Sequence, residues 1–454
     1  MLNEMIQKSR QAQKEFESFS QPQVDRIVRE IGKVVYDNAE MLAEMAIEET
    51  RMGVYEHKVA KNKGKAKVIW NDLKDKKSVG EIYRDPITNI VEIAKPIGVV
   101  GAVTPTTNPI VTPMCNAMFA VKGRNSIIVA PHPRAKNCSA KTVELINARI
   151  RELGAPEGLV QIIDQPSIDK TNELMQLADV VVATGGMGMV KAAYSSGKPA
   201  YGVGAGNVQV IVDRDIDFNA AAQKIIDGRT FDNGIICSGE QSVIAHADDF
   251  DAVMKAFSDN GAYVVTSDEE KAKFRNAIFS GDHMNKDVVG QSTEKIAQMA
   301  GVEIPKNTRV ILLEADGIGN EDILCKEKMC PVMVTFKYQT FDEAVQIAKT
   351  NLEIEGNGHS AAIHSDNIDN IKKVGEVLSV SRLVVNAPSA TTAGGSFFNG
   401  FSPSTTLGCG SWGNNSISEN FTYKHLLNIS RIGLLREDVK VLGDDEIWAF
   451  STSA

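Results

Sequence analysis

The hydrophobic and polar positions of the chain follow two different periods in succession. Residues 1–75 place apolar side chains at helical spacing, for example Val24, Ile27 and Ile31, in a background rich in Ala, Glu, Lys and Met. Short β-branched runs such as IGVVGAV and DVVVAT then alternate with helix-like stretches such as 138–153. Strands that alternate with helices form parallel sheets whose two faces are both covered. The pattern predicts a helical lead-in followed by an α/β fold.

A glycine-rich segment divides this alternation into two parts. GVGAGN, at residues 202–207, follows the first set of strand-like runs, and TRVILLE, PVMVTFKY, SAAIHS and RLVVN form a second set. We therefore expect a first domain at 1–206 and a second at 207–386. The next residues, 387–424, lack periodicity and are dense in Gly, Ser, Thr and Asn. Their interleaved aromatic residues favour an ordered wrap over apolar surface, with a flexible linker as the alternative.

Composition limits the class of protein. The chain has 454 residues, 43% of them hydrophobic, which is enough to fill two cores of ordinary size. A net charge of −9 without any basic stripe argues against a nucleic-acid partner. The start MLNEMIQKSR is not an apolar leader and no run of 18 apolar residues occurs, so we expect no membrane association. Six cysteines without framework or zinc-ligand spacing predict free thiols, no metal site and a cytoplasmic protein.

The best candidate for a nucleophile is Cys237. It lies in FDNGIICSGEQ, on a glycine turn between a helix-like and a strand-like stretch, among small polar residues. Substrate could reach a sulfur in such a turn, and we expect its backbone N–H groups to lower the thiol pKa. The alternative is an inert cysteine that packs as a small hydrophobic residue.

Two strand ends have the features of an anion site. Thr184, Gly185 and Gly186 follow the run DVVVA and open a helix, so free N–H groups and the helix dipole would face a phosphate. A βα turn without ligand is the alternative, since a lysine replaces the third glycine of GxGxxG. A second turn, APHPRAK, carries His132 and Arg134, whose charge would suit a ribose 2′-phosphate. The alternative is that this turn is an ordinary solvated basic loop.

A third strand end has the sequence TPTTNP. Asn108 lies between two prolines that restrict its backbone, so its amide could donate a hydrogen bond to a developing oxyanion. An ordinary turn asparagine is the alternative.

Several motifs together resemble a known family. TPTTNP, APHP, ATGG, GVGAGN, DNGIICSGEQ, CKEKMCPV, GHSAAIHS and VVNAP, in this order and spacing, are similar to the CoA-acylating aldehyde dehydrogenases over nearly the whole chain. The resemblance implies an aldehyde dehydrogenase-like fold with a Rossmann-type cofactor domain in 1–206 and an α/β catalytic domain in 207–386. It also implies an active-site loop at 387–424 and a small oligomerisation arm from 81–95 and 425–454. Because of this arm, the resemblance also implies that the protein assembles as a homodimer or tetramer.

The resemblance also implies roles for single residues. Cys237 matches the nucleophile, Asn108 the oxyanion donor, Gly185 with Gly186 the pyrophosphate turn, and Glu327 the glutamate that binds the nicotinamide ribose. Cysteine attack on an acyl-CoA would give a thioester that a hydride then reduces. The expected cofactor-binding residues are Thr104, Pro105, His132, Arg134, Thr184, Gly185, Gly186, Gly204 and Glu327.

The sequence differs from the hydrolytic members of the superfamily at positions that determine the acyl acceptor and the choice between NAD and NADP. The glutamate that activates water there falls at about Gly202 here, so CoA rather than water should accept the acyl group. Ala130 and Pro133 replace the lysine and the ribose-binding glutamate, and with Arg134 they favour NADP, NAD being the alternative. Coenzyme A is then the co-substrate.

Other motifs bear on the acyl group. KVVYDNAEM, PMCNAM, KAAYSSGKPAYGVG and TTLGCGSWGNNSISEN are most similar to members that interconvert succinyl-CoA and succinate semialdehyde. The alternatives are acetyl-CoA or another short acyl-CoA, a hydrolytic aldehyde dehydrogenase, an acyl-phosphate reductase, or a nucleotide-binding scaffold without catalysis.

Succinyl carries a distal carboxylate, which needs donors or a cation when it is buried. Ser238 and Ser396 could supply hydroxyls, and Arg229 or Arg382 a cation; His359 could shuttle a proton. Structural roles remain the alternatives for both arginines and for the histidine.

Overall fold

Four helices open the chain, as the periodicity of residues 1–75 predicts. The computed structural model describes residues 2–437 and 439–450. The apolar stripe of the second helix, including Val24, Ile27 and Ile31, is wholly buried beneath the first sheet. The helices are α1 (Leu2–Phe16), α2 (Gln21–Asp37), α3 (Ala39–Thr50) and α4 (Tyr55–Leu73).

The first sheet is parallel and five-stranded, in the order β5-β4-β3-β6-β7. Apolar clusters on its two faces show that α2, α5 and α6 cover one face and that α1, α7 and α8 cover the other. The chain runs from β3 outward to β5 and then returns to β6, so the carboxyl ends of β3 and β6 flank a topological switch point. Ligands bind at such crevices in doubly wound sheets. The elements are β3 (Val99–Thr104), α5 (Val111–Lys122), β4 (Ser126–Pro131), α6 (Lys136–Arg151), β5 (Val160–Ile162), α7 (Ile168–Leu177), β6 (Val180–Thr184), α8 (Met187–Tyr194) and β7 (Ala200–Val203).

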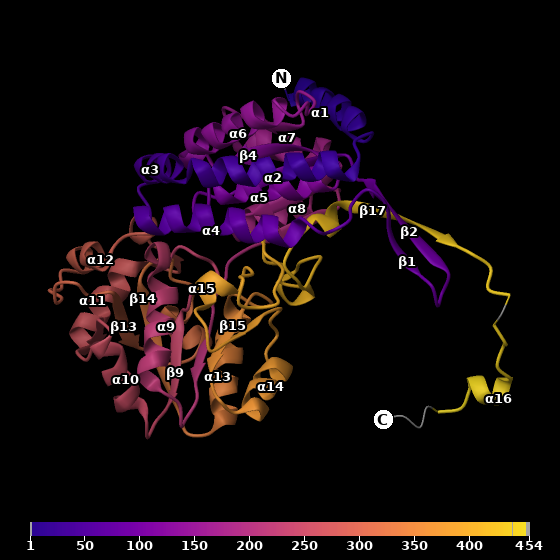
Figure 1. Cartoon of the computed structure of the whole chain (residues 1–454). Helices are drawn as coiled ribbons and strands as arrows, with labels where there is room; N and C mark the ends of the chain where they lie inside the picture. Colours follow the sequence, from indigo (N-terminus) through magenta and orange to yellow (C-terminus); the bar gives the residue numbers. More distant parts are fainter. Residues whose placement is uncertain (1, 438, 451–454) are drawn as a thin grey trace.

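The second sheet is parallel and seven-stranded, in the order β10-β13-β14-β9-β8-β15-β16. Helices α9 and α10 cover one face, and α11, α12, α13 and α14 cover the other. Figure 1 shows the two sheets with their helices as an upper and a lower body, joined where β7 leads into β8. The parallel α/β prediction is confirmed for both. The elements are β8 (Val210–Val212), α9 (Phe218–Thr230), β9 (Ser242–His246), α10 (Phe250–Asp259), β10 (Ala262–Val265), α11 (Asp268–Ile278), α12 (Thr293–Ala300), β13 (Val310–Glu314), β14 (Val332–Tyr338), α13 (Phe341–Ile354), β15 (Ala361–His364), α14 (Ile368–Val377) and β16 (Leu383–Val385).

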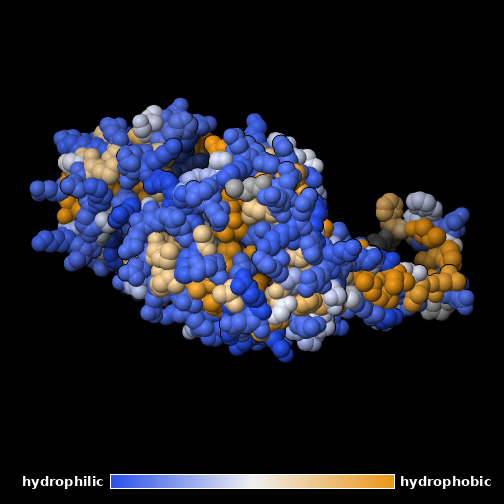
Figure 2. All heavy atoms as spheres, turned by 90° about the horizontal axis from the view of Figure 1, so that it is seen from above, coloured by the Kyte–Doolittle hydropathy of each residue, from blue (hydrophilic) through white to orange (hydrophobic). Residues whose placement is uncertain are grey.

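A third, antiparallel sheet projects from the side of the molecule (Figure 1). It pairs β1 (Gly80–Asp85) with β2 (Ile90–Pro96), and β2 with β17 (Leu427–Gly433). We call these three strands the arm. Beyond it lies a tail whose apolar side chains are exposed, Trp448 by 82% and Phe450 by 98%. Figure 2 shows this apolar surface on the extension. Within the expected segment 425–454, residues 438 and 451–454 lie outside the described part of the chain.

The segment 387–424 packs across the junction of the two bodies. It contains the one-turn helix α15 (Ser389–Thr392), and a bridge joins Leu407 to Asn420. The Asn420 side chain donates to the carbonyls of Ala393 and Ser402. The segment is therefore an ordered wrap and not a linker. Among residues 2–437 and 439–450, none of the helices combines the length and the apolar character that crossing a bilayer requires.

Candidate active site

Cys237 and Asn108 line one cavity of about 340 Å³. The cavity lies between α4, the turn after β3, the turn before β9 and the wrapping segment. Its lining therefore comes from both α/β bodies and from residues 387–424. The polar and reactive side chains that line it are Lys61, Lys65, Lys67, Asn108, Cys237, Ser238, Thr391, Ser396, Ser404 and Thr405.

The turn that presents Cys237 has an unusual backbone. Asp232, Asn233 and Gly234 follow α9 at φ values of 53°, 52° and 72°. This left-handed region suits glycine and, among other residues, chiefly asparagine and aspartate. The Gly239 N–H then donates to the Ile236 carbonyl at 2.8 Å and closes a tight loop around the sulfur. The sequence FDNGIICSG thus supplies the residue types that this turn requires.

The electrostatics of the thiol contradict the sequence prediction. Burial raises the pKa of Cys237 to about 12, and the nearby Glu327 carboxylate acts in the same direction. The turn N–H group and Arg382 lower the thiol pKa, but by less than burial raises it. The expectation of a lowered thiol pKa is therefore wrong, because desolvation penalises the thiolate more than the turn stabilises it. The resting thiol is protonated at neutral pH.

Asn108 has the freedom that an oxyanion donor needs. It is half-buried, and within the part of the chain that the structure describes, no residue hydrogen-bonds its side-chain amide. Its main-chain carbonyl accepts from the Thr112 N–H at 3.2 Å, which ties the turn to the start of α5. A fixed backbone with an unoccupied amide that faces the cavity fits the role predicted for this residue.

The crevice at the ends of β3 and β6 fits a dinucleotide pyrophosphate. Thr104 is buried and its hydroxyl has no partner among the described residues, which marks a place for a ligand atom. Gly186 precedes the first helical residue of α8, and a Cβ atom on it would meet only open space. Backbone N–H groups can therefore approach a phosphate there. Thr184 contacts the wrapping segment, with its hydroxyl oxygen 3.0 Å from that of Thr406.

The other predicted cofactor residues surround this crevice to different degrees. Pro105 is half-buried after β3, and Gly204 is close enough to α8 that a Cβ atom would lie 2.2 Å from the Met187 sulfur. His132 and Arg134 are exposed at the end of β4, where the His132 ring accepts from the Arg134 N–H at 3.1 Å. Both side chains can therefore reach a ligand beside β4.

Glu327 lies close to the nucleophile from the opposite side. One of its oxygens accepts from the Gly206 N–H at 3.2 Å. A Cβ atom on Gly206 would lie 1.9 Å from the Cys237 carbonyl oxygen, so the two backbones are in direct contact. Burial and Glu355 raise the pKa of the Glu327 carboxyl to about 8. The segment Gly204–Gly206 thus connects the cofactor crevice to the sulfur.

The structure refines the position where hydrolytic enzymes carry their glutamate. Gly202 lies under α8: its N–H donates to the Tyr194 hydroxyl at 2.9 Å, and a Cβ atom would come within 3 Å of Val190 and Tyr194. Within the glycine-rich segment 202–207, Gly206 is the residue whose backbone contacts that of Cys237. Neither glycine carries a carboxylate.

Arg229 is not a substrate ligand, contrary to one sequence hypothesis. It is wholly buried, and Nε and Nη1 donate to the carbonyls of Cys330 and Glu240 at 2.9 and 3.0 Å. Its remaining nitrogen donates to the Lys328 and Cys330 carbonyls. All three guanidinium nitrogens therefore donate to backbone carbonyls, which joins α9 to two other segments.

Arg382 likewise has no donor directed at the cavity. It donates to the Ser360 hydroxyl at 3.1 Å, to the Asn420 side chain at 3.0 Å and to the Gly408 carbonyl at 2.8 Å. These bonds join β16 to the wrapping segment, so the alternative of a structural arginine is the correct one.

His359 is close to the nucleophile turn but is uncharged. Its side chain is wholly buried, and Nδ1 lies 3.0 Å from the Ser360 hydroxyl. Nδ1 also lies 3.3 Å from where a Cβ atom of Gly206 would stand. Burial and Arg382 lower the pKa of the imidazole to about 3. The ring is therefore neutral throughout the working pH range.

Lys65 is the site residue that sequence reasoning missed. This half-buried side chain reaches the cavity from α4, and its ammonium donates to the carbonyls of Gly394 and Ser404 at 2.8 and 3.2 Å. Burial lowers its pKa to about 8. Lysines at 58, 61 and 65 fall on one helix face among buried residues, and that spacing is the signal the sequence offered.

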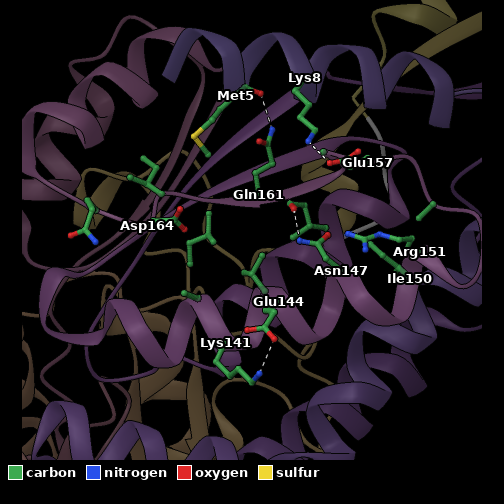
Figure 3. Close-up of a pocket in the computed structure, with 18 of the residues that line it drawn as sticks. Met5, Lys8, Lys141, Glu144, Asn147, Ile150, Arg151, Glu157, Gln161 and Asp164 are labelled. Atoms are coloured by element: carbon green, nitrogen blue, oxygen red, sulfur yellow. Dashed lines mark hydrogen bonds and ion pairs between the residues drawn. The ribbon is translucent and has the colours of Figure 1, made fainter. Parts of the chain in front are cut away.

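A larger cavity of about 1010 Å³ lies elsewhere, along the β5 edge between α1 and α6 (Figure 3). None of the predicted site residues lines it. Four of its charged groups form ion pairs, Lys8 with Glu157 at 2.5 Å and Lys141 with Glu144 at 2.8 Å. The smaller cavity, which holds the nucleophile, is therefore the candidate active site. In residues 2–437 and 439–450 no group of three or more His, Cys, Asp or Glu side chains could hold a metal ion.

The fold and sequence have close counterparts. The family model of the aldehyde dehydrogenase family matches residues 1–426. The chain is 60% identical to a succinate-semialdehyde dehydrogenase (acetylating) of Clostridium kluyveri, over 98% of each chain. An acetylating aldehyde dehydrogenase from Geobacillus thermoglucosidasius superposes with a TM-score of 0.93 at 39% identity, over 97% of each chain. A propionaldehyde dehydrogenase from Rhodopseudomonas palustris, solved with CoA and an acylated cysteine, gives a TM-score of 0.85 at 29% identity, over 96% of this chain and 97% of that one.

Proposed function

The chain belongs to the aldehyde dehydrogenase family, and we propose that it is a CoA-acylating member that interconverts succinyl-CoA and succinate semialdehyde through a thioester on Cys237. The observation that carries this proposal is one cavity lined by a sulfur, a free amide and a cation, on Cys237, Asn108 and Lys65. The sulfur and the amide serve acyl transfer, and the cation suits an acyl chain that ends in a carboxylate.

In the reductive direction the sulfur of Cys237 attacks the carbonyl carbon of the acyl-CoA, and its proton is transferred to the departing CoA sulfur. The Asn108 amide and the Cys237 N–H bind the oxyanion, a contribution of about 3 kcal/mol per well-placed donor. The C–S bond to CoA breaks, CoA leaves as the thiol, and the acyl group remains on Cys237. A nicotinamide cofactor, when bound, supplies the hydride that reduces this thioester. Cys237 then leaves as the thiolate and releases the aldehyde.

The acyl acceptor in the oxidative direction follows from the carboxylates near Cys237. Gly202 and Gly206 offer none, and burial raises the pKa of the Glu327 carboxyl to about 8, so that group is mostly protonated at neutral pH. Water attack without a general base is slow, whereas the thiol of CoA is a better nucleophile and needs less assistance. This chemistry favours CoA over water and argues against the hydrolytic alternative.

The distal carboxylate of a succinyl group pairs in this proposal with Lys65. At neutral pH a lysine whose pKa is about 8 is mostly protonated. Two carbonyls accept from its ammonium, which leaves one N–H for a substrate oxygen. Ser238 and Ser396 line the same cavity and supply hydroxyls. Acetyl-CoA, the alternative substrate, has no group that would use this cation.

NADP is our choice of cofactor, with NAD as the alternative. Arg134 is exposed at the end of β4, where a ribose 2′-phosphate would lie, and Pro133 stands in place of a carboxylate that would repel that phosphate. Arg134→Leu should raise KM for NADPH at least tenfold and leave KM for NADH within about threefold. Equal changes for both cofactors would argue against a 2′-phosphate contact.

Assembly and location are further parts of the proposal. The exposed apolar tail, with Leu435 at 81% and Val441 at 80% exposure, favours burial against a second copy in a homodimer or tetramer. Six free cysteines favour the reducing cytoplasm. Light scattering of the full chain and of a chain that ends at residue 434 would test the assembly.

A steady-state comparison tests the proposed reaction. Purified protein should reduce succinyl-CoA with NADPH or NADH, and should use butyryl-CoA and acetyl-CoA less well. Cys237→Ala should abolish the reaction. Strict inactivity with every acyl-CoA at saturating cofactor would end the acylating proposal, and full activity of Cys237→Ala would refute Cys237 as the nucleophile.

A further inference from the structure

Lys61 touches both of the turns that form the proposed oxyanion site. Its ammonium donates to an Asp232 carboxylate oxygen at 2.6 Å and to the Thr107 carbonyl at 3.3 Å. Asp232 starts the turn that presents Cys237, and Thr107 directly precedes Asn108. The side chain is only 8% exposed, so its position is set by these partners. One helix of the first body thus connects a segment of each body.

The Asp232 turn depends on such anchoring. A non-glycine residue in the left-handed region costs roughly 1 kcal/mol or more, and two of them occur here in succession. The carboxylate also accepts from the Val54 N–H at 2.9 Å and from Lys58 at 3.0 Å. Each of these bonds holds the turn against α4 and its N-terminus. Lys61 differs from these two partners in that it also hydrogen-bonds the segment that carries Asn108.

The charges of this cluster make the role testable. Two lysines share one buried carboxylate, so removal of either lysine leaves a matched ion pair and no isolated charge. Burial and Lys61 lower the pKa of Lys58 to about 8, which keeps it mostly protonated at pH 7. Lys58 and Lys61 are therefore comparable in charge, in helix and in carboxylate partner. They differ in the contact to Thr107 and in lining the cavity that holds Cys237.

We propose that Lys61 is a positioning residue that holds the Asn108 amide and the Cys237 N–H at one fixed spacing, so that both can bind the same oxyanion. The proposal rests on the roles proposed above for Cys237 and Asn108. Without this bridge each turn keeps its own fold, but their relative position is free to shift, and two donors that must converge on one oxygen lose most of their effect.

The experiment compares Lys61→Met with the matched control Lys58→Met at pH 7. The first readout is the burst of p-nitrophenol on mixing with p-nitrophenyl acetate, which reports acylation of Cys237 through an oxyanion and needs neither CoA nor cofactor. The second is the rate of alkylation by iodoacetamide, which uses the same sulfur but forms no oxyanion. We expect Lys61→Met to slow acylation by about 10- to 100-fold and to leave alkylation within about twofold. Lys58→Met should change both rates less than threefold.

Four results would overturn the inference. Equal slowing of acylation in both variants would show that Lys61 only neutralises Asp232. Parallel slowing of acylation and alkylation in Lys61→Met would show a displaced sulfur instead of displaced donors. Unchanged acylation in Lys61→Met, or no burst of p-nitrophenol from the wild-type protein, would refute the proposal that Lys61 positions the two donors. Because the ester assay involves no acyl-CoA, failure of the proposed succinyl-CoA reaction would appear separately as wild-type inactivity in the reductase assay.

Discussion

Replacement of Lys65 by methionine should change which acyl-CoA the protein prefers. The ammonium lies in the cavity beside Cys237 and is held by the Gly394 and Ser404 carbonyls. Methionine keeps the length and the apolar body of the side chain but removes the charge. Succinyl-CoA and butyryl-CoA have four-carbon acyl chains, and only succinyl ends in a carboxylate. The two substrates therefore isolate the contribution of the cation.

The expected magnitude follows from the bond that is lost. A hydrogen bond between charged groups is worth about 1.5–3 kcal/mol, which corresponds to a decrease of roughly 10- to 150-fold in kcat/KM for succinyl-CoA. For butyryl-CoA the change should stay within about threefold. Lys63→Met is the matched control, since Lys63 lies on the same helix but pairs with Glu40 at the surface. Equal losses with both substrates, or an unchanged preference, would refute the assignment of Lys65 to the carboxylate.

The pH dependence gives an independent check of the same contact. Lys65 binds a carboxylate only when protonated, and its pKa in the empty site is about 8. The preference for succinyl-CoA over butyryl-CoA should therefore be greatest below pH 8 and decline as pH rises through that value. A bound carboxylate raises the lysine pKa, which moves the decline to higher pH at saturating substrate. In Lys65→Met the ratio of the two kcat/KM values should be independent of pH.

Three other substitutions or conditions give clear expectations. Because burial raises the Cys237 pKa to about 12, the rate of its alkylation by iodoacetamide should rise about tenfold per pH unit from 7 to 10, and a plateau below pH 9 would contradict this. Gly202→Glu should lower the free energy of unfolding by about 1–3 kcal/mol, since its side chain meets Val190 and Tyr194, and thermal melts would measure this loss. The same variant should not oxidise aldehydes in an assay without CoA. Arg229→Met should destabilise the fold by several kcal/mol in denaturant titrations, because three buried carbonyls lose their donor. The ratio of kcat/KM for succinyl-CoA to that for butyryl-CoA should not change. A selective loss of activity with succinyl-CoA would show that Arg229 binds the substrate.

The sequence located the nucleophile and its turn but misjudged the acidity of the thiol. FDNGIICSG contains the residues that a left-handed turn demands, so Cys237 had to emerge from such a turn. The pKa depends on burial in the folded protein and on charges such as Glu327 and Arg382, which are distant in sequence. Local N–H groups were visible in the sequence, and the desolvation that outweighs them was not.

The choice of cation shows the same limit. The sequence offers Arg229 and Arg382 as candidate cations without a pattern that selects between them, and the Arg229 guanidinium donates to the backbone carbonyls of Cys330 and Glu240. Lys65 is 172 residues away from Cys237, yet it shares the cavity with it. Distance along the chain carries no information on such a pair, because contact is decided by how α4 packs across the junction of the two bodies.

The sequence by itself determined the succession of parallel α/β units and the two glycine-rich turns. These properties depend on local periodicity and on residue types that a turn requires, and both act over fewer than about twenty residues. Only the tertiary structure decided that Arg229 binds backbone carbonyls, that Lys65 lines the cavity of Cys237 and that Lys61 joins the turns of Asp232 and Asn108. Burial, charge compensation and convergence on one cavity arise from surfaces that meet when the two bodies pack, and their energies belong to the packed arrangement and not to any segment of it.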